Sequence, residues 1–118
     1  MNKEKKKRIY LSGAISGYDL NGRREAFARK KAELEGFGYE VFNPLENGLP
    51  ADAATSAHMR RDFEELLRCD AIYMMSRCFA SAGCMTEFHV ATAIGLDVYF
   101  EDYRPVGDID GRGESWKG

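Results

Sequence analysis

Two carboxylates and a tyrosine occupy positions from which they could act together on one acetal-like carbon. Glu87 follows a small-residue loop near the start of a predicted helix, Asp62 lies at the edge of a buried helix face, and Tyr10 lies on a predicted strand. At such a carbon one carboxylate attacks while the other manages a proton, as in retaining glycosidases. We expect Tyr10 to be buried, with a hydroxyl that needs a partner.

Position alone leaves simpler roles open for both acids. Glu87 also fits a surface glutamate that complements the helix macrodipole, which would hold its carboxylate ionised. Asp62 also fits one end of a surface ion pair with Arg60, Arg61 or a neighbouring residue, a contact worth less than about 1 kcal/mol.

A loop of small residues follows the first predicted strand. It matches neither the dinucleotide-binding glycine fingerprint nor a P-loop, because it lacks both the G-x-G-x-x-G spacing and a closing Lys-Ser/Thr. Small residues still let backbone N–H groups approach an anion or a sugar, although a plain strand-to-helix turn fits as well. The candidate substrate-binding residues in this loop are Gly13, Ala14, Ile15, Ser16 and Gly17.

The elements that must position these residues alternate between strand and helix. Apolar runs predict strands, and helix-period patterns closed by glycines predict helices. One helix, from about Ser56, should bury the face formed by Met59, Phe63, Leu66 and Leu67. The predicted strands cover 8–12, 39–42, 69–75 and 96–100, and the predicted helices cover 21–36, about 56–67 and the segment from the 76–83 loop to about 94.

This alternation predicts an α/β fold, a small Rossmann-like (flavodoxin-like) three-layer sandwich with a mainly parallel sheet of four to five strands. Ligands of such sheets bind beyond the carboxyl ends of the strands, at the point where the strand order reverses. The loops 13–17 and 76–83 follow the first and third strands, so function should be sought there.

Length and composition bound the classes of protein. A chain of 118 residues that is 44% hydrophobic and 31% charged is a single domain, with a basic lead-in at 1–7 and an irregular tail at 103–118. The net charge of −2 argues against a nucleic-acid polymer as partner. No apolar run reaches the roughly 18 residues of a membrane span, and no secretory h-region follows the basic start.

The three cysteines favour a reduced, cytoplasmic protein, because their number is odd and their spacing is unpaired. Cys78, Cys84 and His89 match no established zinc spacing, so we expect no metal. Nothing in the pattern requires an organic cofactor.

Three segments together resemble the nucleoside 2-deoxyribosyltransferase superfamily, including its 2'-deoxynucleoside 5'-monophosphate N-glycosidases. The resemblance covers roughly residues 8 to 100. Its three segments are Ile-Tyr-Leu-Ser-Gly-Ala-Ile-Ser-Gly at 9–17, Arg-Asp-Phe-Glu-Glu-Leu-Leu at 61–67 followed by Cys-Asp-Ala, and Ser81-x-Gly83-x-x-x-Glu87 with Gly95 eight residues later.

The resemblance implies a role for each candidate. Glu87 would be the catalytic glutamate at the anomeric carbon, Asp62 the acid that handles the proton of the leaving base, and Tyr10 a hydrogen-bond partner of the nucleophile. The loop 13–17 would line a nucleoside or nucleotide. Ser81 and Gly83 would form a phosphate-contacting turn, and we also expect Asn43, at the end of the second strand, to contact substrate. The family completes its site with a neighbouring subunit, so we expect a homodimer or a higher homo-oligomer, to which Trp116 could contribute.

Departures from the family pattern keep an alternative open. Met85 replaces a glycine two residues before Glu87, and Phe88-His89 replaces Leu-Gly after it. The loop ahead of the helix lacks the transferases' additional acid, which favours hydrolysis over base exchange. The main expectation is cleavage of an N-glycosidic bond, and the alternative is a nucleotide-binding module of the same fold without turnover. A small interaction protein without a ligand is a third possibility.

Overall fold

A four-stranded, entirely parallel sheet forms the centre of the protein, and its strand order is β2-β1-β3-β4. The computed structural model describes residues 6–15 and 17–102. The tail expected at 103–118, including Trp116, therefore lies outside the described residues, as does Ser16. The strands are β1 (Arg8–Ser12), β2 (Glu40–Phe42), β3 (Ala71–Met74) and β4 (Asp97–Phe100).

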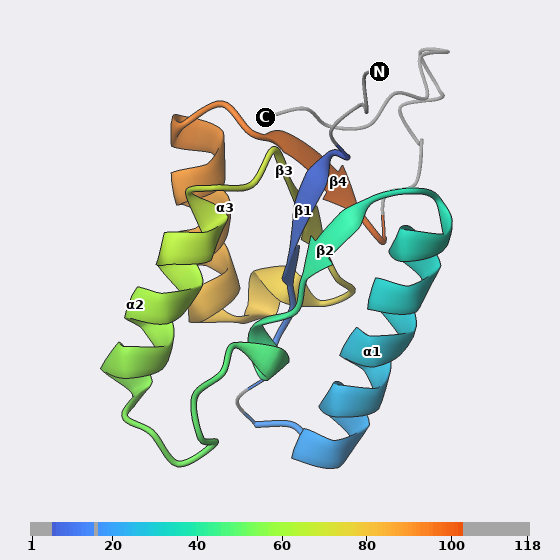
Figure 1. Ribbon diagram of the computed structural model, residues 1–118. Helices are drawn as coiled ribbons and strands as arrows, with labels where there is room; N and C mark the ends of the chain where they lie inside the picture. Colours follow the sequence, from blue (N-terminus) through green and yellow to red (C-terminus); the bar gives the residue numbers. More distant parts are fainter. Residues whose placement is uncertain (1–5, 16, 103–118) are drawn as a thin grey trace.

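The sheet is covered by helices on both faces, which confirms the predicted α/β sandwich (Figure 1). The helix α1 (Leu20–Gly36) lies on one face, and α2 (Thr55–Leu66) and α3 (Ala82–Ala93) lie on the other. Alternate residues of β1 serve the two faces: Ile9 and Leu11 pack with Phe27 of α1, whereas Tyr10 packs with Leu66 of α2. The central strands β1 and β3 are mostly apolar and almost wholly buried, because helices cover both of their faces, whereas the edge strands β2 and β4 are more exposed.

The strand order reverses between β1 and β3. The chain goes from β1 to β2 on one side and then returns to place β3 on the other side of β1. The loops after β1 and β3 therefore flank a topological switch point, as the sequence predicted. The described residues also contain two 3-10 turns, η1 (Pro44–Glu46) after β2 and η2 (Cys78–Ala80) after β3.

The buried face of α2 differs from the predicted one. Leu66 is fully buried and Phe63 packs partly against the core, but Leu67 is 59% exposed. Glu65 is buried in its stead. Its carboxylate is compensated by three arginines, which is how a charged side chain can be buried at all.

Two further boundaries differ from expectation. Helix α3 begins at Ala82, so Gly83 belongs to its first turn and not to the preceding loop. Lys7, assigned to a solvated lead-in, is tied to β4: its Nζ lies 2.8 Å from Asp97 Oδ2 and donates to Tyr99 Oη at 2.9 Å. Among the described residues, no helix has the length and apolar character needed to cross a membrane.

Candidate active site

A carboxylate held by two hydroxyl groups lies at the centre of the candidate site. Tyr10 Oη donates to Glu87 Oε2 at 2.7 Å, and Ser12 Oγ donates to Glu87 Oε1 at 2.6 Å. Tyr10 and Ser12 are two residues apart on β1 and therefore point to the same face of the sheet. Both are fully buried, and Glu87 reaches them from the second turn of α3. Each carboxylate oxygen thus has a fixed donor, so the orientation of the group is set by the sheet.

Burial dominates the electrostatics of Glu87. It raises the pKa of this carboxyl from 4.5 to about 7; the hydrogen bonds from Ser12 and Tyr10 oppose the rise, and the negative charge of Asp62 adds to it. The expectation that the helix macrodipole would hold Glu87 ionised is wrong, because Glu87 lies beyond the first turn and is partly buried. Burial also raises the pKa of Tyr10 far above its ordinary value, so Tyr10 stays a hydrogen-bond donor.

Asp62 is close enough to Glu87 and Tyr10 for its charge to raise the pKa of both groups. Its Oδ1 accepts a hydrogen bond from Asn47 Nδ2 at 2.9 Å. Burial raises the pKa of Asp62 and outweighs the lowering caused by Asn47 and by positive charge nearby. Within the described residues no ion pair joins Asp62 to Arg60 or Arg61, so the surface-pair alternative is not what the structure contains.

The loop after β1 has a buried part and an exposed part. A Cβ on Gly13 would lie 2.8 Å from Phe27 Cζ and 2.9 Å from Met75 Sδ, so the backbone there runs directly against the core on the α1 side. The carbonyl of Ala14 accepts a hydrogen bond from Arg23 Nε at 2.7 Å. Gly17 is exposed and has a positive φ of 87°, a conformation that favours glycine.

The substrate contacts predicted for Ile15, Asn43, Ser81 and Gly83 remain predictions, as do those predicted for Gly13, Ala14 and Gly17. Ile15 O accepts from Tyr18 N at 3.2 Å and closes a turn. Asn43 is buried and caps η1, with its Oδ1 accepting from Leu45 N at 3.0 Å. Ser81 is the N-cap of α3, and its Oγ accepts from Cys84 N at 3.3 Å.

The residues that depart from the family pattern lie on either side of Glu87. The ring of Phe88 packs against Phe79 at a centroid distance of 5.4 Å and against Phe100 at 6.1 Å, so those contacts are toward η2 and β4. His89 is exposed. Met85 is half-buried in the first turns of α3.

Sequence reasoning missed two residues of this constellation. Ser12 could have been found, because it follows Tyr10 at the strand period of two and carries a hydroxyl at the carboxyl end of β1. Asn47 gave no comparable signal, since its burial depends on how the 45–55 segment packs onto α2. In the described ranges, no three side chains of His, Cys, Asp or Glu are grouped as metal ligands would be.

A cleft of about 350 Å³ opens on the opposite face of the sheet, alongside α1. Three cationic side chains and two glutamates contribute to its lining. Its lining residues are Arg23, Ala26, Arg29, Lys30, Glu33, Met75, Ser76 and Glu101. It does not include Glu87, Asp62 or Tyr10.

Comparisons with solved structures agree with this fold. A 2-deoxyribosyltransferase from the psychrotolerant bacterium Bacillus psychrosaccharolyticus superposes with a TM-score of 0.64 at 19% identity, covering 79% of this chain and 70% of that one. The Clostridium botulinum CMP N-glycosidase BcmB superposes with a TM-score of 0.58 at 20% identity, covering 89% of this chain and 79% of that one. At these identities the likeness establishes the fold. A comparison with curated protein sequences returned no match.

One family model matches most of the chain, over residues 7–100, and its description is "Domain of unknown function (DUF4406)". The match spans all four strands and the three α-helices, and therefore every candidate residue described above. The chain belongs to this DUF4406 family, within the nucleoside 2-deoxyribosyltransferase-like superfamily.

Proposed function

We propose that this protein cleaves the N-glycosidic bond of a nucleoside or a nucleoside 5'-monophosphate, with Glu87 as the nucleophile. The observation that carries the proposal is the Glu87 carboxylate, held by Tyr10 and Ser12 at the switch point with Asp62 nearby. Two carboxyl groups that must share protons are suited to displacement at an anomeric carbon. The activities named for the two structural neighbours, deoxyribosyl transfer and CMP N-glycoside cleavage, support the same bond type.

The reaction takes two displacements. An oxygen of the Glu87 carboxylate attacks the anomeric carbon, the bond from that carbon to the base nitrogen breaks, and Asp62 gives its proton to the departing base. Water then attacks the same carbon, Asp62 takes the proton of that water, and the bond to Glu87 breaks. The products are the free base and the free sugar or sugar phosphate, and both carboxyl groups return to their starting states.

We favour water over a second base as the acceptor, because the segment ahead of α3 offers no additional acid. Residues 79–81 are Phe, Ala and Ser. Gly13, Ala14, Ser81 and Gly83 are proposed to line the nucleotide. Homo-oligomerisation and a cytoplasmic location stay predictions from the sequence.

The test is chromatographic. The protein is incubated with ribo- and deoxyribonucleosides and their 5'-monophosphates, including modified bases, and free base is measured. We expect release by the wild-type protein, loss by at least about a thousandfold in Glu87→Gln as a missing nucleophile requires, and normal release by Glu33→Gln. Glu33 is a matched control because its carboxylate is exposed on α1.

The second candidate is a nucleotide-binding module without turnover, and Met85 is the feature that favours it. That reading predicts intact substrates across the whole panel, together with a rise in Tm when a nucleotide is added, because a ligand that binds only the folded state stabilises it. Substrates that stay intact without any rise in Tm would contradict both candidates.

A further inference from the structure

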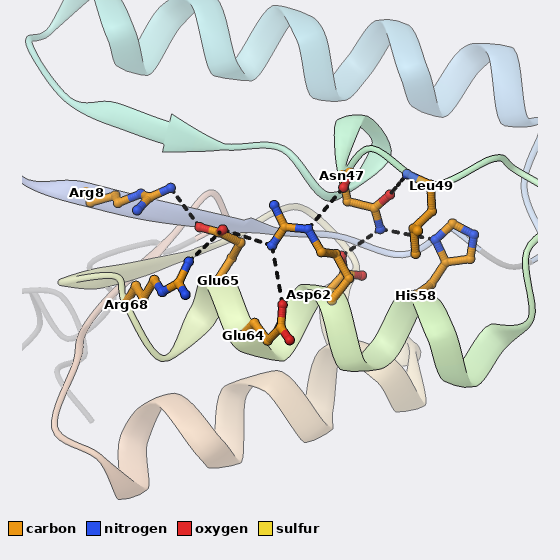
Figure 2. A network of polar contacts seen from close by, with 9 residues as sticks. Arg8, Asn47, Leu49, His58, Asp62, Glu64, Glu65 and Arg68 are labelled. Carbon is orange, nitrogen blue, oxygen red and sulfur yellow. Dashed lines mark hydrogen bonds and ion pairs between the residues drawn. The ribbon is translucent and has the colours of Figure 1, made fainter.

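In the part of the chain that the structure describes, the Asp62 carboxylate accepts its side-chain hydrogen bond from the amide of Asn47. Asn47 follows η1 and is 5% exposed, so its side chain is removed from water. Its Nδ2 donates to Asp62 Oδ1 at 2.9 Å and lies 3.1 Å from His58 Nδ1 (Figure 2). A buried amide with both N–H groups engaged has little freedom to rotate.

The orientation of this amide is fixed by its other end. Asn47 Oδ1 accepts the backbone N–H of Leu49 at 3.0 Å, so the NH2 group must face Asp62 and His58. His58 Nδ1 is then an acceptor, and its Nε2–H donates to the carbonyl of Pro50 at 3.1 Å. Every donor in this set of contacts meets an acceptor, and the assignment leaves one N–H of the Asn47 amide for Asp62.

The backbone that carries Asn47 is anchored as well. Arg61 Nε donates to the carbonyl of Asn47 at 3.2 Å, and Arg61 Nη1 donates to Glu65 Oε2 at 2.8 Å. The other oxygen of Glu65 accepts from Arg8 Nη2 on β1 at 2.7 Å. The loop is thereby tied to α2 and, through Glu65, to the strand that also carries Tyr10 and Ser12.

We propose that Asn47 is the positioning residue of the general acid: it holds Oδ1 of Asp62 and leaves Oδ2 as the oxygen that carries the proton to the leaving base. An oxygen that already accepts an N–H is the poorer site for a proton, so Oδ2 is the donor. The inference rests on the proposed N-glycosidic cleavage. It adds a residue, and a direction of proton delivery, that the two carboxyl groups alone do not specify.

The test compares two leaving groups on one sugar. A nucleoside or nucleotide that the wild-type protein cleaves needs its base protonated, whereas a 4-nitrophenyl glycoside of the same sugar departs as a phenolate and needs no proton. In Asn47→Ser the hydroxyl can still cap the turn at Leu49 but cannot reach Asp62. We compare kcat/KM, which reports the first displacement, because the second displacement is common to both substrates and uses Asp62 again. We expect kcat/KM for the natural base to fall by roughly tenfold or more, part of the range assigned to general acids, and kcat/KM for the 4-nitrophenyl substrate to change by less than about threefold.

His58→Ala provides a second variant that leaves Asn47 in place. It removes one of the two acceptors of the amide and should give the same selective loss, smaller in size. Glu46→Gln is the matched control. Glu46 is the last residue of η1, directly before Asn47, and its side chain forms an exposed ion pair with Lys31. This variant should cleave both substrates at the wild-type rate.

Any of four results would overturn the inference. An equal loss on both substrates would make Asn47 a structural residue, and no loss on the natural base would remove it from proton delivery. If Asn47→Ser does not fold, His58→Ala replaces it as the test, and an equal loss on both substrates in His58→Ala contradicts the inference. A wild-type protein that cleaves neither substrate would refute the proposed function itself, and the inference would fall with it.

Discussion

Tyr10 on β1 and Glu87 on α3 are 77 residues apart in sequence, yet the tyrosine hydroxyl lies 2.7 Å from the glutamate carboxylate. The strand end and the helix meet at the switch point of the sheet, where β1 lies between β2 and β3. Because Tyr10 is fully buried, the contact is shielded from water and is stronger than the same pair would be on the surface. It joins a rigid sheet to the group proposed to attack substrate.

This contact predicts the pH dependence of kcat/KM. The proposed chemistry needs a single proton on the pair of Glu87 and Asp62, and Asp62 carries it when the ionised Glu87 attacks. Because burial raises the pKa of Glu87 to about 7, we expect the pair to lose this proton as the pH rises through about 7. Activity should therefore fall as the pH rises through about 7. In Tyr10→Phe a hydrogen bond that favours the ionised form is gone, so the falling limb should move up by about one pH unit.

Ser12→Ala should move the same limb in the same direction, since Ser12 donates to the other oxygen of Glu87. Tyr99→Phe is the control. Tyr99 lies on β4, where its hydroxyl accepts a hydrogen bond from Lys7, and within the described residues it donates no hydrogen bond to Glu87 or Asp62. If the fall of kcat/KM occurs at the same pH in wild type, Tyr10→Phe and Ser12→Ala, the ionisation of Glu87 does not cause it.

A second prediction concerns the free energy of unfolding. Glu87 binds its proton more tightly in the folded protein than in the unfolded chain, where its pKa is near 4.5. The folded state therefore holds more protons between pH 4.5 and 7, and stability declines as the pH rises across that window. The Glu87 contribution is on the order of 3 kcal/mol. Glu87→Gln should lose this decline, so its stability relative to wild type should be higher at pH 8 than at pH 5.

Urea denaturation at pH 5, 6, 7 and 8 measures the effect, with Glu33→Gln as the control for removing an exposed carboxylate. If the free energy of unfolding changes with pH in the same way in wild type and in Glu87→Gln, Glu87 has the same pKa in the folded and the unfolded state.

The strands and the position of the site could be predicted because they depend on local pattern. Apolar runs bounded by glycine and polar residues give β1 its limits, and the order of strands and helices identifies the switch-point edge. The buried Glu65 and the exposed Leu67 could not be predicted, because the charge of Glu65 is compensated by Arg8 from β1 as well as by neighbours on its own helix. The raised pKa of Glu87 has the same origin, since burial by distant segments produced it.

The third prediction concerns the tight contact between Gly13, in the loop after β1, and the core side chains of Phe27 and Met75. In Gly13→Ala the new methyl group would lie 2.8 Å from Phe27 Cζ and 2.9 Å from Met75 Sδ, both in the buried core. Overpacking of this kind costs about 1–3 kcal/mol. Gly36→Ala, at the exposed end of α1 with no atom within 4 Å of its Cβ, should be neutral or stabilising by up to about 1 kcal/mol. Equal stability of the two variants in urea denaturation would show that the loop can move away from the core.

The last prediction compares two neighbouring glutamates of α2. Glu65 is buried and accepts from Arg8 Nη2 at 2.7 Å and from Arg61 Nη1 at 2.8 Å, whereas the side chain of Glu64 is 64% exposed and lies 3.9 Å from Arg61. Burial acts to raise the pKa of Glu65, but the hydrogen bond from Arg61 and the charges of Arg8 and Arg68 outweigh it and lower the pKa overall.

Removing the charge should therefore have very different costs at the two positions. Glu65→Gln leaves its arginines without a counter-charge in a partly buried setting and should lower the free energy of unfolding by about 1–3 kcal/mol at pH 7. Glu64→Gln should change it by less than about 0.5 kcal/mol. Since the folded-state pKa of Glu65 is lowered, its contribution is complete above the unfolded pKa and disappears as the pH falls through the folded value, so the two variants should converge in acid. A Glu65→Gln protein as stable as Glu64→Gln at pH 7 would mean that the three arginines do not stabilise the junction of α2 with β1.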